Sequence, residues 1–221
     1  MKLSRILLSA LLISGMNFAY STTPAAPTYA PVQGQAGKDV IWIPTPEGLI
    51  DKMLTAANVT HQDKVFDLGA GDGIIAITAA RKYNAQSVGI EFNPDMAQFA
   101  RRKVAEAGLN DKVRIITGDI FQEDFSSATV VTLYLMPHLN MKLRPTLLKM
   151  KPGTRIVSHA FTMGDWEPDE TMSYRHSVGY FWVVPAQVEG AWVMNGMDGG
   201  PIRLNMSQSF QNIGGTLTRD S

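Results

Sequence analysis

A glycine-rich turn between a buried strand and a helix is the feature that most limits how this 221-residue chain can fold. Residues 65–68 are apolar except for Asp67, as in a buried strand, and residues 74–82 have a helical pattern. The turn between them holds three alternating glycines, Gly69, Gly71 and Gly73. Glycines let backbone N–H groups approach a ligand closely, so the turn predicts a ligand pocket at the end of a strand.

The order of acids and glycines in this turn separates two kinds of cofactor. A dinucleotide fingerprint needs a glycine at the sixth position counted from Gly69, where this chain has Ile74. Asp67 instead precedes the first glycine by two residues. A carboxylate there adds nothing to a pyrophosphate site, but it suits a ligand with an ammonium group and a positive sulfur. We therefore expect S-adenosylmethionine (SAM), bound by Asp67, Gly69, Gly71 and Gly73.

Strand-like and helix-like segments alternate from residue 39 onward, which predicts an α/β sheet. Strands are expected at 65–68, 87–92, 112–117, 129–135 and 154–158. Helices are expected at 74–82, from Asn93 to about 107, and at about 139–150, and a first helix is expected to begin with Thr45 as its cap and Pro46 in its first turn. Beyond residue 179 the pattern is β-rich, with strands expected at 179–184, 191–194 and 201–210. This end either extends the sheet or forms a small addition.

Residues 65–80 resemble the first motif of the class I, seven-strand SAM-dependent methyltransferases, and further motifs follow in the family's order. Glu91 closes the next strand, where the family's acid accepts hydrogen bonds from the ribose hydroxyls. Asp119 and Ile120 follow the third strand, where the family contacts the adenine amino group and ring. The resemblance implies a Rossmann-like seven-strand sheet with helices on both faces, followed here by a β-rich C-terminal extension. Glu91 as a surface acid and Asp119 as a helix cap are the alternatives.

Two further stretches, residues 41–46 and 133–137, resemble a narrower family. It comprises protein-lysine methyltransferases that modify two mitochondrial membrane proteins, ATP synthase subunit c and the adenine nucleotide translocase, and it has many bacterial relatives. This resemblance implies protein-lysine methylation as the activity and allows a membrane-associated substrate. It also assigns four residues to the substrate side of the site: Trp42, Pro44, Thr45 and Pro137.

Catalytic candidates follow from the geometry of parallel sheets, in which ligands bind at the carboxyl ends of strands. Tyr134, at the end of the predicted fourth strand, is placed to orient an acceptor amine. His138 and His159 are candidates to take its proton. Each of the three has a purely structural alternative, as a packing residue or a surface residue.

Composition narrows the class of partner. Lysine plus arginine and aspartate plus glutamate are 20 each, so no basic excess favours a nucleic-acid partner. The chain has no cysteine, and no His/Asp/Glu group has metal-ligand spacing, so no metal is expected. The oligomeric state does not follow from the sequence.

The amino terminus has the three parts of a secretory signal peptide. Lys2 and Arg5 precede an apolar run over 6–16, and Ala19 and Ser21 suit a cut before Thr22. We expect residues 1–21 to be a signal peptide of a periplasmic or exported protein, with an N-terminal membrane anchor as the alternative. Residues 22–38 are expected to be a linker, 39–186 the methyltransferase domain and 187–221 the β-rich extension.

The function expected from these features is methyl transfer from SAM to a nucleophile, with a protein lysine amine as the first choice. A small-molecule methyltransferase is one alternative, because Trp42, Tyr134 and Trp166 are candidates to line an apolar pocket. A non-catalytic exported protein that keeps the SAM fold is the other. The leader motivates that alternative, because SAM is made in the cytoplasm.

Overall fold

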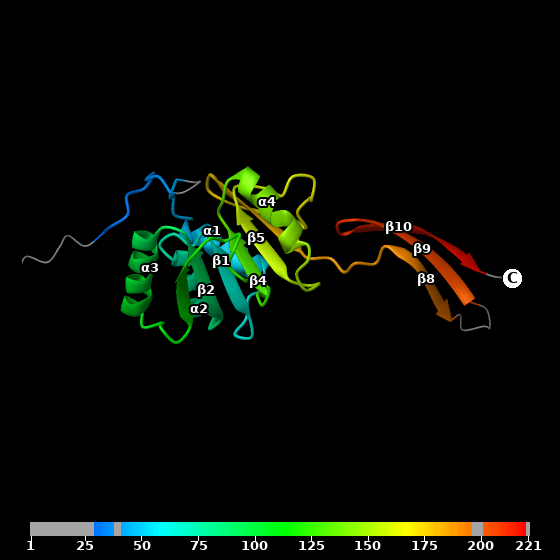
Figure 1. Ribbon diagram of the computed structural model, residues 1–221, viewed down its shortest axis with the longest axis horizontal. Helices are drawn as coiled ribbons and strands as arrows, with labels where there is room; N and C mark the ends of the chain where they lie inside the picture. Colours follow the sequence, from blue (N-terminus) through cyan, green and yellow to red (C-terminus); the bar gives the residue numbers. More distant parts are fainter. Residues whose placement is uncertain (1–28, 38–40, 196–200, 220–221) are drawn as a thin grey trace, which may run out of the picture.

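A seven-stranded sheet forms the body of the protein in a computed structural model, which describes residues 29–37, 41–195 and 201–219 (Figure 1). Its strand order is β3-β2-β1-β4-β5-β7-β6. The first five strands are parallel, and β7 runs antiparallel between β5 and β6. The strands are β1 Lys64–Leu68, β2 Gln86–Glu91, β3 Val113–Thr117, β4 Val130–Leu133, β5 Arg155–His159, β6 Glu170–Tyr174 and β7 Ser177–Val183. The predicted seven-strand α/β fold is therefore confirmed.

Helices cover both faces of this sheet because successive strand residues point to opposite sides. The helices are α1 Glu47–Ala56, α2 Ile74–Tyr83, α3 Pro94–Glu106 and α4 Pro137–Leu147. Val65 belongs to the apolar cluster with α1 and α2, whereas its neighbour Phe66 belongs to the cluster with α4. The two clusters hold the parallel strands in a fixed layer, and their carboxyl ends form one edge of the sheet.

Two helix starts differ in how well the sequence predicted them. The Asn93 side chain accepts hydrogen bonds from the backbone N–H groups of Asp95 and Met96, so the predicted cap of α3 is confirmed. The predicted cap of α1 is wrong: Pro46 occupies the cap position, and no side chain caps the helix. The Thr45 hydroxyl lies 3.0 Å from His159 Nδ1 instead, so a contact 114 residues away replaces the local one.

The β-rich carboxyl end both extends the main sheet and forms a small addition, the two outcomes that the sequence left open. Strands β6 and β7 extend the main sheet, and three more strands form a separate antiparallel sheet in the order β10-β9-β8. These are β8 Gly190–Asn195, β9 Pro201–Ser209 and β10 Asn212–Arg219. Figure 1 shows this second sheet projecting away from the body. Strands β6 and β10 were not expected, and part of the predicted turn after β8, residues 196–200, lies outside the described residues, as does the leader.

None of the helices in the described residues is long and apolar enough to cross a membrane.

Candidate active site

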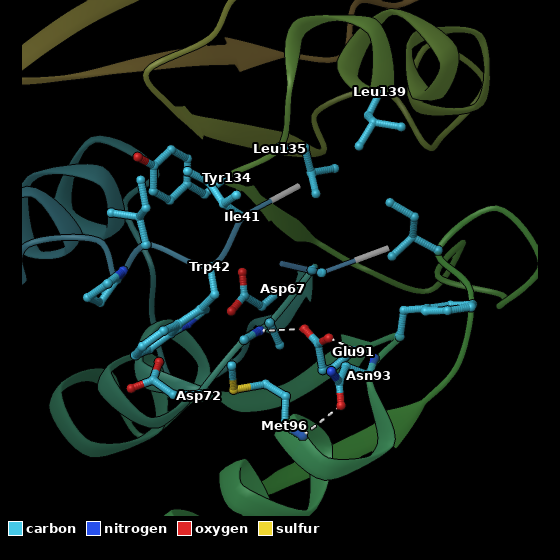
Figure 2. A pocket seen from close by; sticks show the side chains of 18 of the residues that line it. Ile41, Trp42, Asp67, Asp72, Glu91, Asn93, Met96, Tyr134, Leu135 and Leu139 are labelled. Carbon is cyan, nitrogen blue, oxygen red and sulfur yellow. Dashed lines mark hydrogen bonds between the residues drawn. The ribbon is translucent and has the colours of Figure 1, made fainter. Parts of the chain in front are cut away.

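A cavity of about 290 Å³ opens at the carboxyl edge of the parallel strands (Figure 2). Residues that follow β1, β2, β3, β4 and β5 all contribute to its wall, together with a segment that precedes α1. Ligand sites in open α/β sheets lie at this edge, because the strand ends present loops and helix N-termini there.

The glycine turn forms the floor of the cavity. Gly71 has a left-handed φ of 54°, and a Cβ built on it would lie 2.7 Å from Nε1 of Trp42. Any larger residue would therefore push the indole away and strain the backbone. Gly73 has a φ of 78° and occupies the cap position just before α2, but it does not line the cavity. Glycine at these positions lets the turn stay narrow between the ligand space and the Trp42 ring.

Asp67 stands at the end of β1 with its carboxyl group almost fully buried. The Thr132 hydroxyl donates a hydrogen bond of 2.6 Å to its Oδ1. Burial is the main reason that the pKa of Asp67 rises to about 7, and the nearby carboxyl groups of Asp72 and Glu91 contribute to the rise. A cation bound in the cavity would restore the ionised form, since an opposite charge at short range stabilises a carboxylate.

Glu91 closes β2 and is held rigidly by the backbone. Its two carboxylate oxygens accept hydrogen bonds of 2.8 Å from the N–H groups of Gly71 and Asn93 (Figure 2). Burial raises the pKa of Glu91, and these backbone donors oppose that effect. A carboxylate oxygen has more than one lone pair, so each oxygen can also accept a ligand hydroxyl.

The turn after β3 supplies another part of the wall. Asp119, Ile120 and Phe121 all line the cavity. The Asp119 carboxylate accepts a hydrogen bond of 2.9 Å from the Phe121 N–H, which fixes the turn. Lys142 Nζ lies 3.8 Å from the centre of the Phe121 ring on the side of α4. The acid and the apolar side chains therefore line the cavity in the turn after β3; their contact with adenine stays a prediction.

A segment before α1 covers part of the cavity. Residues 35–37 and 41–45 line it, and the chain just upstream is attached to α3. The Arg102 guanidinium donates a hydrogen bond to the Tyr29 carbonyl, and the rings of Tyr29 and Phe99 meet edge to face. The described part of the predicted linker, residues 29–37, thus lies against the body and contributes to the site.

Tyr134 forms the wall beyond the end of β4. The His159 ring lies against it, with centroids 3.8 Å apart and ring planes tilted by 34°, and the Thr45 hydroxyl lies 3.0 Å from His159 Nδ1. Burial lowers the pKa of His159 to about 4 and raises that of Tyr134. At neutral pH the imidazole is therefore uncharged and the phenol keeps its proton.

The residues predicted for the site divide into two groups. The cavity brings together Trp42, Pro44, Thr45, Asp67, Gly69, Gly71, Glu91, Asp119, Ile120 and Tyr134. His159 stands behind Tyr134, while Pro137 and His138 are exposed in the first turn of α4, outside the cavity lining. Trp166 is fully buried and stacks on Phe210, so it forms part of the core and no pocket wall.

Several apolar wall residues were not predicted. Leu135 and Met136 follow Tyr134, Leu139 comes from α4, and Phe161 comes from the loop after β5. The sequence signal for Leu135 and Met136 was their place beside Tyr134 in a motif. Phe161 had no such signal, because its position depends on Asn140, whose amide donates to the Phe161 and Thr162 carbonyls.

The donor set fits SAM. A buried carboxyl group with a raised pKa suits the cationic amino acid end, and the backbone-held Glu91 suits a ribose diol. Gly71 has no room for a Cβ beside Trp42, and a glycine there lets a ligand approach the backbone closely. Among the described residues, no group of three or more His, Asp or Glu side chains is arranged to hold a metal ion.

Comparisons with known proteins agree with this geometry. A family described as the ANTKMT methyltransferase domain matches residues 67–170. A protein-lysine N-methyltransferase of Saccharolobus islandicus is 42% identical over 60% of this chain and 84% of its own length. The mouse adenine nucleotide translocase lysine N-methyltransferase is 30% identical, but the match spans only 48% of this chain and 46% of the mouse protein.

The solved structure of a relative contains the demethylated form of the cofactor. The crystal structure of an RNA methyltransferase from Salinibacter ruber, in complex with S-adenosyl-L-homocysteine, is 48% identical with a TM-score of 0.65. The match covers 66% of this chain and 96% of that one. The acceptors for which these relatives are named differ, whereas methyl transfer is common to the group.

Proposed function

Because this chain belongs to the SAM-dependent methyltransferase family of the Saccharolobus protein-lysine N-methyltransferase, we propose that its methyl acceptor is a protein lysine amine. The observation that carries the proposal is the mixed lining of the cavity around the end of β4. Ile43, Leu139 and Phe161 line the cavity together with Tyr134. Apolar side chains of this kind suit the alkyl stem of lysine, and the Tyr134 phenol offers a hydrogen-bonding partner for its nitrogen.

SAM supplies a methyl group on a positively charged sulfur, and the residues of this chain orient the two reactants. Asp67 and Glu91 would hold the amino acid and ribose parts, and Asp119 with Ile120 the adenine. Tyr134, which stays protonated, would accept a hydrogen bond from the amine and direct its lone pair. Holding the reactants in line and excluding water accounts for most of the rate enhancement in such a displacement.

The lysine amine must also lose a proton before it can attack the methyl group. An imidazole with a pKa of about 4 is a poor acceptor for the proton of lysine, whose ordinary pKa is about 10.4. We assign His159 a positioning role through Tyr134, and the amine is expected to lose its proton to solvent before it enters. His138 is too far round the first turn of α4 to line the cavity.

Transfer of tritiated methyl groups from SAM into an extract of the source organism tests the acceptor. Label in protein, located on lysine by mass spectrometry and absent with the Asp67→Asn protein, supports the proposal. Label that ribonuclease releases would favour RNA, the acceptor for which the Salinibacter protein is named. Label in extractable small molecules, or cofactor binding without any transfer, would favour the small-molecule enzyme or the non-catalytic protein.

We also propose that residues 1–21 direct export, with an N-terminal membrane anchor as the alternative. The support is the order of basic, apolar and small residues in the sequence. A fusion of residues 1–40 to alkaline phosphatase should be active in a periplasmic assay, and an inactive fusion would contradict the proposal.

A further inference from the structure

The turn that follows β5 has a strained backbone. Ala160 has a left-handed φ of 67°, which brings the Cβ of an L-residue too close to the following carbonyl oxygen. Its N–H donates a hydrogen bond of 2.8 Å to the Val178 carbonyl on β7, and the Phe161 N–H donates one of 2.9 Å to the His159 carbonyl two residues back. A positive φ inside such a three-residue turn is rare and strained. A residue other than glycine keeps this conformation only where the surrounding structure imposes it.

Two fully buried side chains, Asn140 on α4 and Ser158 on β5, hold this turn in place. The Asn140 amide donates hydrogen bonds to the Phe161 carbonyl at 3.2 Å and to the Thr162 carbonyl at 3.3 Å. The Ser158 hydroxyl donates one of 2.7 Å to the same Phe161 carbonyl and accepts one of 3.2 Å from the Asn140 amide. We call Asn140 and Ser158 the clamp, because together they bind the backbone directly after the strained residue.

Asn140 is an unusual residue for its place in the helix. It belongs to the buried face of α4 together with Leu139, Leu143 and Leu147. Asparagine is a weak helix former, and the Oδ1 atom of Asn140 has no hydrogen-bond partner among the described residues. A buried carbonyl oxygen without a partner costs free energy, whereas a leucine would favour the helix and leave no unpaired group. The contribution of Asn140 therefore lies in the hydrogen bonds that its amide donates to the turn.

The strained turn joins two residues that the proposed function places on the acceptor side of the cavity. His159 comes directly before Ala160 and lies against the Tyr134 ring, with centroids 3.8 Å apart. Phe161 comes directly after Ala160 and lines the cavity. The clamp residues and Ala160 are not part of the cavity lining. Any effect of the clamp on the reaction must therefore pass through the turn and its two neighbours.

We infer that Asn140 is a positioning residue for methyl transfer, which acts by keeping the strained turn in the shape that presents Phe161 and the His159–Tyr134 pair to the acceptor. The inference rests on the proposed function, which assigns these three residues to the acceptor. A wall that is fixed before the acceptor binds lowers the cost of ordering it. A displacement of about 1 Å in such a wall can lower a rate about 100-fold. Cofactor binding is expected to be independent of the clamp, because the glycine turn and Glu91 follow other strands.

Asn140→Leu tests the inference in the tritiated-methyl assay at saturating SAM. The variant removes the amide donors and keeps a buried helix position, so the transfer rate at limiting extract should fall by at least about tenfold. The dissociation constant of S-adenosylhomocysteine, measured by calorimetry, should stay unchanged. The matched control is Thr154→Val. It removes a buried hydroxyl that donates a hydrogen bond of 2.7 Å to the Lys151 carbonyl at the opposite end of β5, and it should transfer at the wild-type rate.

Substitutions at Ala160 separate positioning from folding. Glycine adopts a positive φ without strain, so Ala160→Gly added to Asn140→Leu should restore most of the lost rate. Valine strongly disfavours a positive φ, so Ala160→Val should reproduce the loss with the clamp intact, and it decides the question alone if Asn140→Leu does not fold. A merely structural role for Asn140 predicts a lower melting temperature and no recovery with glycine, which only adds freedom to the unfolded chain.

The outcomes distinguish this inference from the proposed function. Normal transfer into protein lysine by Asn140→Leu or by Ala160→Val would overturn the inference and leave the proposed function standing, as would a loss that Ala160→Gly does not restore. Label that the wild type places in RNA or in small molecules would overturn the lysine acceptor. A loss in Asn140→Leu that glycine restores would then support the positioning role for that other acceptor. A wild type that labels nothing would overturn both.

Discussion

Asp67→Asn should stabilise the empty protein while it removes cofactor binding. Ionising Asp67 in the folded chain costs free energy because burial moves its pKa from 3.8 to about 7. At about 1.36 kcal/mol per pKa unit, this amounts to about 4 kcal/mol at pH 8, an upper limit for the gain. The amide oxygen of asparagine can still accept the Thr132 hydrogen bond, so the substitution leaves that contact intact.

The difference in the free energy of unfolding between wild type and Asp67→Asn should depend on pH. Below pH 3.8 the carboxyl group is protonated in both the folded and unfolded states, so wild type and variant should have similar free energies of unfolding. Between pH 3.8 and about 7 only the unfolded state releases the proton, so wild-type stability falls relative to the variant. Above pH 7 the loss is complete and the difference is constant. Urea unfolding of both proteins at pH 4 to 8 measures it.

Cofactor binding should favour wild type over Asp67→Asn, whereas the stability of the empty protein should favour the variant. S-adenosylhomocysteine at 100 times its dissociation constant stabilises wild type by about 2.7 kcal/mol, and the variant should show no thermal shift. Since SAM requires the ionised form, its wild-type affinity should weaken about tenfold from pH 8 to pH 6, below a pKa of about 7.

A contrasting variant completes this test. Burial raises the pKa of Asp63, but hydrogen bonds from Arg155, Thr129 and Thr60 outweigh that effect and hold the pKa below its usual value. Asp63→Asn should therefore destabilise the protein at pH 8. If Asp67→Asn also destabilises the empty protein and retains normal cofactor affinity, the role given to Asp67 is refuted.

Four more outcomes are expected. Tyr134→Phe should lower kcat at least tenfold with little change in SAM affinity, as measured by single-turnover kinetics and calorimetry. Gly71→Ala should abolish SAM binding because Trp42 fills the space of its Cβ, whereas Gly108→Ala, with a similar φ but open surroundings, should bind normally. Leu147→Ala in the core should cost about 2–5 kcal/mol in urea unfolding. Methylation of lysine should rise about tenfold per pH unit from pH 7.5 to 9.5 in initial rates, because the amine is expected to lose its proton to solvent.

The sequence predicted where Gly71, Glu91 and Asp119 lie in the fold, because these positions follow local rules. The strand, glycine turn and helix around Gly71 are consecutive in the chain, and Glu91 and Asp119 each stand at a strand end. Parallel strands bring such ends to one edge, so position along the chain is nearly enough to place them. The cap of α3 at Asn93 is equally local.

Other parts of the cavity wall depend on contacts that no local pattern encodes. Thr45 looked like a helix cap, but a buried histidine 114 residues later takes its hydroxyl. Phe161 reaches the cavity only because Asn140 on α4 holds its loop. Strand β10 was missed because Gly214 and Gly215 weaken its β pattern, and pairing with β9 overrides that local preference.

The division of the cavity wall between separate stretches of chain has a consequence for how specificity can change. Under the proposed function, the wall residues within 67–121 would hold SAM, whereas those within 41–45 and 134–161 would face the acceptor. Substitutions in the second set can alter what is methylated without touching the glycine turn or Glu91. Under this proposal, the acceptor can change while the residues that would hold SAM stay the same. Relatives at 42% and 48% identity that are named for lysine and for RNA are consistent with such an exchange.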